Sequence, residues 1–147
     1  MTARAIKFID THSHLQVERL DGHRAQWLAQ AREAGLENIL LCAGAPEDWE
    51  RTLSTAHEWG LGAMLGIHPL WLDSTTPAEL VGLRELAESL LDDPHFIGLG
   101  EVGLDGFEPG LDQHKAEQVF LEELKIARDL DLSLIHISEP TRPISIS

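Results

Sequence analysis

The chain has 147 residues, of which 43% are hydrophobic, and a formal net charge of −14 at pH 7. This length and hydrophobic content are enough for one folded domain with a real core. The strong negative charge argues against a large basic surface for nucleic acid, and no apolar run reaches the roughly 18 residues that a membrane-spanning helix needs.

The single cysteine and the N-terminal residues indicate the cellular compartment. Cys42 cannot form an internal disulfide, and we expect it to pack as a small hydrophobic residue at the end of a strand. The first residues show no charged and then apolar leader. We therefore expect a cytoplasmic location, without membrane association, and the sequence predicts no protein partner.

Short apolar segments alternate with amphipathic segments along the chain, which is typical of parallel βα units. Each predicted helix carries apolar residues at helical spacing, and these stripes are expected to form core. The first helix is predicted to end at Gly35, and the later helices are predicted to cover residues 46–58, 77–91 and 113–129. Strands are predicted near residues 6–11, 38–42, 61–67 and 96–100.

Two histidines, His12 and His14, stand where the first predicted strand runs out. Side chains at positions i and i+2 of an extended segment point to the same face, with Cα atoms roughly 6 to 7 Å apart. Two neutral imidazoles at that separation can bind one divalent ion. The alternative is a pair of unrelated surface histidines near the N-terminus.

The apolar segment 96–105 carries one glutamate, Glu101, among three glycines. A buried and unpaired carboxylate would be costly, and a metal ion would offset that cost. Glu101 could therefore bind the ion held by His12 and His14. The alternative is an ordinary residue at a strand end, paired with an arginine.

His68 follows the third predicted strand in the segment Gly66-Ile67-His68-Pro69. In a parallel βα arrangement, His12, His14, His68 and Glu101 would all lie at the carboxyl ends of strands. Barrel enzymes build their active sites there, because the loops that follow the strands converge.

Three segments in this order resemble the TatD-type metal-dependent deoxyribonucleases: FIDTHSHL at 8–15, GIHP at 66–69 and GEVGLD at 100–105. The resemblance implies an α/β TIM-barrel (β/α)8 hydrolase that cleaves phosphodiester bonds of DNA with two divalent ions, of Mg, Mn or Zn. It implies His12, His14 and Glu101 as metal ligands and His68 as a residue beside the substrate. Leu70 departs from the pattern, since family members often carry a second histidine there.

A complete barrel typically needs about 250 residues. Residues 1–131 are therefore predicted to form the N-terminal half of such a barrel, truncated to about the first four βα units. We expect weak metal binding and little or no turnover from this half. Two alternatives stay open, namely an amidohydrolase-type enzyme that acts on a C–N or ester bond, and a noncatalytic fragment.

The last segment, 132–147, reads differently. Its first eleven residues, LSLIHISEPTR, match one translation of the transposon-end adapter used in short-read sequencing libraries, so the segment is predicted to be an adapter-derived tail. The alternative is a genuine fifth strand. The family's histidine on that strand would align with Ile137, and a shift of one residue turns a strand side chain to the opposite face, so His136 is not predicted to be a ligand.

Overall fold

The structure is a computed structural model, and it describes residues 7–106 and 110–139. The strands are β1 (Phe8–Ser13), β2 (Leu36–Cys42), β3 (Gly62–Leu65), β4 (Phe96–Asp105) and β5 (Ser133–Glu139). The α-helices are α1 (Arg24–Glu33), α2 (Trp49–Trp59), α3 (Pro77–Ser89) and α4 (Gln113–Asp129). Three single turns of 3-10 helix are η1 (Glu18–Leu20), η2 (Pro46–Asp48) and η3 (Pro69–Trp71).

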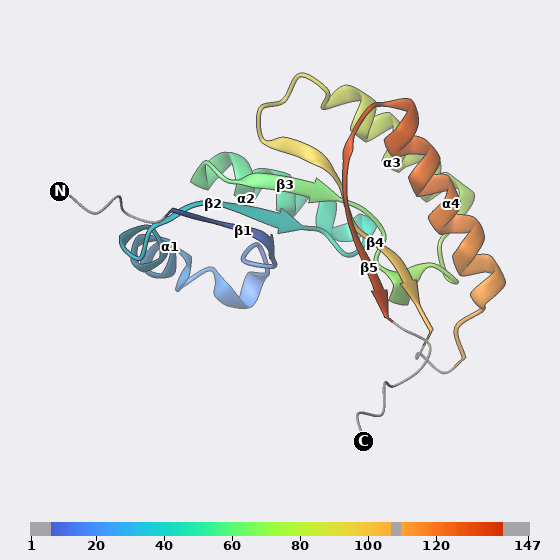
Figure 1. The fold of residues 1–147 in the computed structure, drawn as a ribbon, viewed down its shortest axis with the longest axis horizontal. Helices are drawn as coiled ribbons and strands as arrows, with labels where there is room; N and C mark the ends of the chain where they lie inside the picture. The colour runs from blue at the N-terminus through green and yellow to red at the C-terminus, as the bar shows by residue number, and fades with distance from the viewer. Residues whose placement is uncertain (1–6, 107–109, 140–147) are drawn as a thin grey trace.

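All five strands pair in parallel and in the order of the sequence, from β1 to β5. The sheet curls into a half-barrel, and α3 and α4 lie side by side beyond β4 and β5 (Figure 1). The predicted α/β class with parallel βα units is therefore confirmed. Within the described residues, no helix is both long enough and apolar enough to cross a membrane.

The sheet extends one strand beyond the four predicted units. β5 pairs in parallel with β4, with His136 opposite Val102. Leu132 and Leu134 also pack against the main core, so the alternation of apolar residues in this segment supports a strand. A side chain at Gly98 would clash with the backbone carbonyl of Ser133, so β5 can approach β4 closely because position 98 is glycine.

Two hydrophobic clusters join the sheet to its helices. The larger connects β3 and β4 to α2, α3 and α4, and the smaller connects β2 to α1 and α2. The larger includes Leu65, Leu83, Leu99 and Ile126, whereas the smaller includes Leu28, Ile39, Leu41 and Ala56. The expected apolar stripes of α2, α3 and α4 are thus core, whereas on α1 Leu28 is buried but Trp27 is 42% exposed. Cys42 ends β2 with no exposure, as expected, and burial raises the pKa of its thiol to about 12.

Two strands run further toward their carboxyl ends than predicted, and each extension includes a candidate ligand. β1 continues to Ser13, which pairs with Leu41, and β4 continues to Asp105, which pairs with Glu139. His12 and Glu101 therefore lie within strands rather than in the loops after them. Their backbone positions are fixed by the sheet, which is a more rigid support than a loop.

Candidate metal centre

His12 and His14 meet at one carboxylate oxygen. The Nε2 atoms of His12 and His14 lie 3.1 and 3.3 Å from the same Oε2 of Glu101. The two imidazole rings are 5.2 Å apart between centroids and are inclined at 72°. One ligand atom from each of the three residues lies within 4.8 Å of the other two. The spacing of two positions on β1 therefore places both imidazoles on the side where β4 presents Glu101.

Glu101 is nearly inaccessible, with a side chain that is 5% exposed. Its backbone N–H donates to the carbonyl of Ala43, 3.1 Å away, which ties this point of β4 to the end of β2. Within residues 7–106 and 110–139, the ion pairs of Glu101 are with histidines and none is with lysine or arginine. The described part of the chain thus offers no arginine partner of the kind that the alternative requires.

Hydrogen bonds orient His14 and bias its charge. Nδ1 of His14 lies 2.9 Å from the carbonyl of Cys42, and this bond needs a proton on Nδ1, so Nε2 is left to face Glu101. The hydrogen bond with Glu101 raises the pKa of His14 above its ordinary value, against the lowering effect of burial. Burial alone would raise the pKa of Glu101, but hydrogen bonds from His14 and His68 outweigh it and hold that pKa well below its ordinary value.

His68 contacts the other side of the carboxylate. Its Nδ1 accepts a hydrogen bond from the backbone N–H of Leu70 at 3.1 Å, so its proton resides on Nε2. Nε2 lies 3.2 Å from Oε1 of Glu101, whereas His12 and His14 face Oε2. His68 lies outside the group of three ligand atoms, and its contact with Oε1 puts it next to Glu101.

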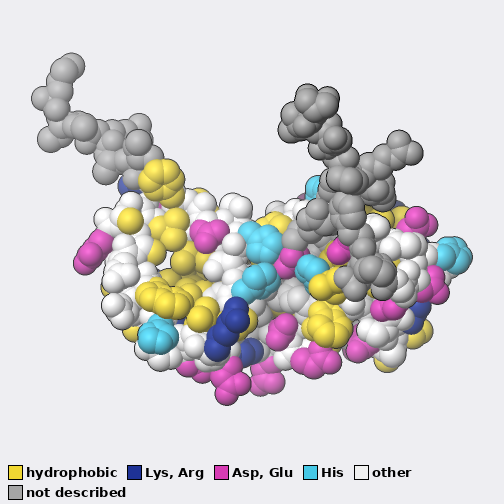
Figure 2. Space-filling view, turned by 90° about the horizontal axis from the view of Figure 1, so that it is seen from below, with side chains coloured by type: hydrophobic (Ala, Val, Ile, Leu, Met, Phe, Trp, Pro, Cys, Tyr) yellow, Lys and Arg dark blue, Asp and Glu magenta, His cyan; other side chains and the backbone are white. Residues whose placement is uncertain are grey.

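The donor set of two imidazole nitrogens and one carboxylate oxygen fits a divalent ion of the zinc or manganese type. The observation behind this fit is the buried carboxylate of Glu101, which among the described residues faces only imidazoles and no permanent positive charge. A metal ion would supply that charge. Figure 2 shows histidine side chains gathered on one face of the molecule, with acidic and basic side chains next to them.

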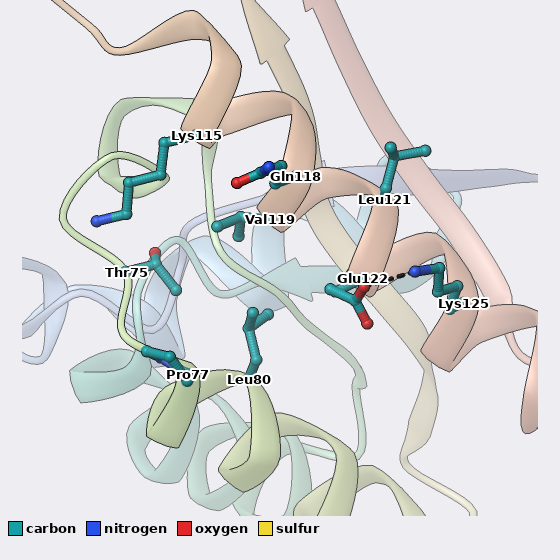
Figure 3. Close-up of a pocket in the computed structure, with 9 residues that line it drawn as sticks. All are labelled: Thr75, Pro77, Leu80, Lys115, Gln118, Val119, Leu121, Glu122 and Lys125. Atoms are coloured by element: carbon teal, nitrogen blue, oxygen red, sulfur yellow. Dashed lines mark hydrogen bonds and ion pairs between the residues drawn. The ribbon is translucent and has the colours of Figure 1, made fainter.

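A separate groove of about 420 Å³ lies between α3 and α4, with Leu80 and Val119 in its wall (Figure 3). Lys125 at its rim pairs with Glu122 at 2.6 Å. None of the candidate ligands lines this groove. It is a space between two outer helices, and it contributes nothing to the metal centre.

Comparison with known proteins identifies the family. Residues 9–142 match the family model described as TatD related DNase. The chain belongs to the TatD family. The uncharacterized metal-dependent hydrolase YjjV of Escherichia coli K12 is 32% identical over 137 residues, which are 92% of this chain and 52% of YjjV. The 3'-5' ssDNA/RNA exonuclease TatD of Cronobacter turicensis is 27% identical over 124 residues, which are 84% of this chain and 46% of that protein.

The fold agrees with this TatD assignment. The crystal structure of YjjV, a TatD homologue from E. coli K12, superposes with a TM-score of 0.84 at 31% sequence identity. The match covers 91% of this chain and 51% of the YjjV chain. The chain therefore spans about half the length of the TatD relatives that it matches.

The sequence analysis missed two residues that support the candidate metal centre. Glu123 on α4 is fully buried, and its Oε1 accepts a hydrogen bond from the backbone N–H of Ile67 at 2.8 Å. Gln16 donates to the carbonyl of Cys42 at 2.8 Å, the same acceptor that His14 uses. Glu123 could have been found from the sequence, because it is a carboxylate on the apolar stripe of a predicted helix. No comparable signal marked Gln16.

His136 on β5 lies away from the candidate ligands. It lines a cavity together with Phe120 and Leu124 of α4, on the side of the sheet that the helix covers. The group of residues that could share a metal ion does not include it.

Proposed function

We propose that this chain is part of a TatD-type hydrolase that cleaves phosphodiester bonds of DNA with divalent metal ions. In this proposal His12, His14 and Glu101 are metal ligands, and His68 lies beside the substrate phosphate. The observation that carries the proposal is the convergence of two imidazole Nε2 atoms on one buried carboxylate oxygen. The names of the TatD relatives, which include a 3'-5' ssDNA/RNA exonuclease, support nucleic acid as the substrate.

Each residue would have a separate task. Bound divalent ions would lower the pKa of a water molecule and stabilise the attacking and leaving oxygens of the phosphodiester. His14 is held by Cys42, so its Nε2 is already directed at the centre. His68 donates to Oε1 of Glu101 and thereby fixes the orientation of the carboxylate. The ions would also provide positive charge for the phosphate in a chain whose net charge is −14.

Because the chain spans about half of its relatives, full activity is proposed for a complete barrel. The half-barrel supplies one ligand set, and a site with two ions needs further ligands. For the chain alone we therefore propose weak metal binding and little or no turnover. We also propose that the chain resides in the cytoplasm.

A calorimetric titration with manganese or zinc tests the metal centre. We expect binding by the parent chain and none by the double variant His12→Ala/His14→Ala, while His114→Ala, an exposed histidine on α4, serves as the matched control. Because little turnover is expected of the chain alone, a full-length TatD relative with and without the two equivalent histidines is then assayed with an end-labelled DNA strand and with an amide substrate. Cleavage of the amide alone would favour the amidohydrolase alternative, and a parent chain that binds no metal would favour a noncatalytic fragment.

A further inference from the structure

Two large apolar side chains stand exposed next to the metal centre. Leu70 is 45% exposed and Trp71 is 53% exposed, and both belong to η3, which begins directly after His68. The backbone N–H of Trp71 donates to the carbonyl of His68 at 2.8 Å, so the indole lies one tight turn from the histidine that contacts Glu101. Figure 2 likewise shows hydrophobic side chains directly beside the group of histidines.

The turn around Trp71 does not depend on its indole. The backbone carbonyl of Trp71 accepts hydrogen bonds from both the backbone N–H and the hydroxyl of Ser74 and of Thr75, at 2.8 to 3.1 Å. These bonds hold the backbone of the turn through the carbonyl of Trp71 and do not involve the ring. Among the described residues, the indole of Trp71 has no stacking partner and no hydrogen bond.

The contrast with Trp49 shows what a structural tryptophan looks like here. Trp49 is 8% exposed, belongs to the main core, and donates from Nε1 to the carbonyl of Gly66 at 3.0 Å. Trp71 instead holds a flat apolar surface toward solvent on a rigid turn. An exposed aromatic ring beside a site is a common feature of ligand contacts, because it offers a large contact area at small entropic cost.

The charge of the chain indicates which part of a nucleic acid this surface fits. With a net charge of −14, the chain has little capacity for extended contact with phosphates. Arg51 is one cation near the loop after His14, but it is already bonded to the carbonyl of Gln16 and to Asp21. Bases stack on aromatic rings whatever their sequence, and only an unpaired strand presents its base faces freely.

We propose that Leu70 and Trp71 form a base-stacking subsite for a single-stranded nucleic acid, next to the phosphate bound at the metal centre. The inference rests on the proposed nuclease function and adds to it the residues that contact a base. Trp71 provides the stacking face, and Leu70 extends the apolar surface toward His68. A duplex keeps its base faces stacked inside the helix, so this subsite selects unpaired strands.

Binding without hydrolysis tests the subsite. Because the chain alone is expected to have little or no turnover, fluorescence anisotropy with manganese present measures its affinity for a labelled oligothymidine and for an abasic strand of equal length. We expect Trp71→Ala to weaken oligothymidine binding about fivefold or more and to leave binding of the abasic strand unchanged. Trp71→Phe keeps a stacking ring and is expected to retain most of the affinity. Trp27→Ala, at the exposed tryptophan that stacks on His23, is the matched control and should bind like the parent.

Three results would overturn the subsite. These are equal oligothymidine affinity in Trp71→Ala and the parent, an equal loss on the abasic strand, and a parent chain that binds neither strand. Thermal melts of Trp71→Ala and Trp71→Phe separate a lost contact from a lost fold, because a loss in both variants with intact melts would also contradict stacking. Metal titration without DNA tests the proposed function separately, so the two can fail independently.

Discussion

Glu123 on α4 accepts a hydrogen bond from the backbone N–H of Ile67, 2.8 Å away, although 56 positions separate the two residues. The carboxyl is fully buried, and among the described residues its Oε2 has no hydrogen-bond partner. Burial raises the pKa of Glu123 well above its ordinary value, which favours the neutral carboxylic acid over the carboxylate. Since Ile67 precedes His68, this bond anchors the backbone that presents His68 to Glu101.

Two substitutions of Glu123 should separate the effect of its hydrogen bond on stability from the effect of its charge. Glu123→Gln keeps an acceptor for Ile67 and is neutral, so we expect a fold at least as stable as the parent at pH 7. Glu123→Leu leaves a buried N–H without a partner, which costs about 1–3 kcal/mol of unfolding free energy. Urea unfolding followed by circular dichroism measures both values. Equal stability of the Leu and Gln variants would show that the bond to Ile67 contributes nothing.

Comparison of Glu123→Gln with the parent gives a pH dependence of folding stability with a defined sign. The folded pKa of Glu123 is raised above 4.5, so its favourable contribution is complete below pH 4.5 and is lost as pH rises toward the folded pKa. Above pH 4.5 the unfolded carboxyl ionises, and folding must take up a proton. The stability advantage of Glu123→Gln over the parent should therefore grow as pH rises from 4.5 toward the raised pKa of the folded state. A constant difference over that range would contradict the buried acid.

Loss of the Glu101 charge should weaken metal binding strongly. Glu101→Gln keeps the shape of the side chain and removes the negative charge that both imidazole nitrogens face, so we expect at least about a tenfold loss of affinity for manganese or zinc. Glu122→Gln is the matched control, since Glu122 is an exposed glutamate on α4 that pairs with Lys125. Calorimetric titration that gives the same affinity for Glu101→Gln and the control would make Glu101 structural only.

Metal binding should compete with protons on His14. The hydrogen bond with Glu101 raises the pKa of His14 above 6.5, and only a deprotonated imidazole binds a metal. Affinity should therefore rise as pH increases through that raised pKa, and binding near pH 6.5 should release protons. In the metal-free chain the sign is opposite, because stability from the charged His14 is present below pH 6.5 and is lost as pH rises. Titrations in buffers of different ionisation enthalpy detect the released protons, and a pH-independent affinity would contradict competition at His14.

The parts of the site that the sequence predicted depend on local patterns. Two histidines at i and i+2 of a strand must share a face, and the parallel βα order brings the ends of β1 and β4 to the same edge. Helix ends were predictable for the same reason, since the capping box at Thr76 and the left-handed Gly60 are local signals.

The remaining features depend on contacts between distant segments. The ends of β1 and β4 are set by the strands beside them, so the apolar runs alone placed the carboxyl ends of both strands too early. The bond between Glu123 and Ile67 joins a helix to a strand end that the sequence does not connect. β5 illustrates the same limit, because its pairing with β4 and the packing of Leu134 are properties of the folded chain.

The origin of residues 132–147 stays a proposal, namely that they are derived from a sequencing adapter. The unassembled nucleotide reads across the codon of Asp131 test it. Reads that leave the adapter sequence and continue into a different coding sequence would support the proposal, and uniform coverage through Ser147 would contradict it. The reads concern origin alone, since a segment of any origin can pair with β4 if its side chains fit.

The contribution of β5 to stability is a separate question, and the structure gives a definite expectation. A chain that ends at Asp131 loses Leu132 and Leu134 from the main core and leaves the edge of β4 unpaired. We expect a lower melting temperature and more self-association than in the parent, as measured by thermal melts and light scattering. A chain that ends at Glu139 keeps β5 and is the matched control. Leu134→Ala should reproduce part of the loss, about 1–2 kcal/mol for a half-buried leucine. If the chain that ends at Asp131 melts like the control, β5 adds nothing to the fold, and the half-barrel is stable with four strands.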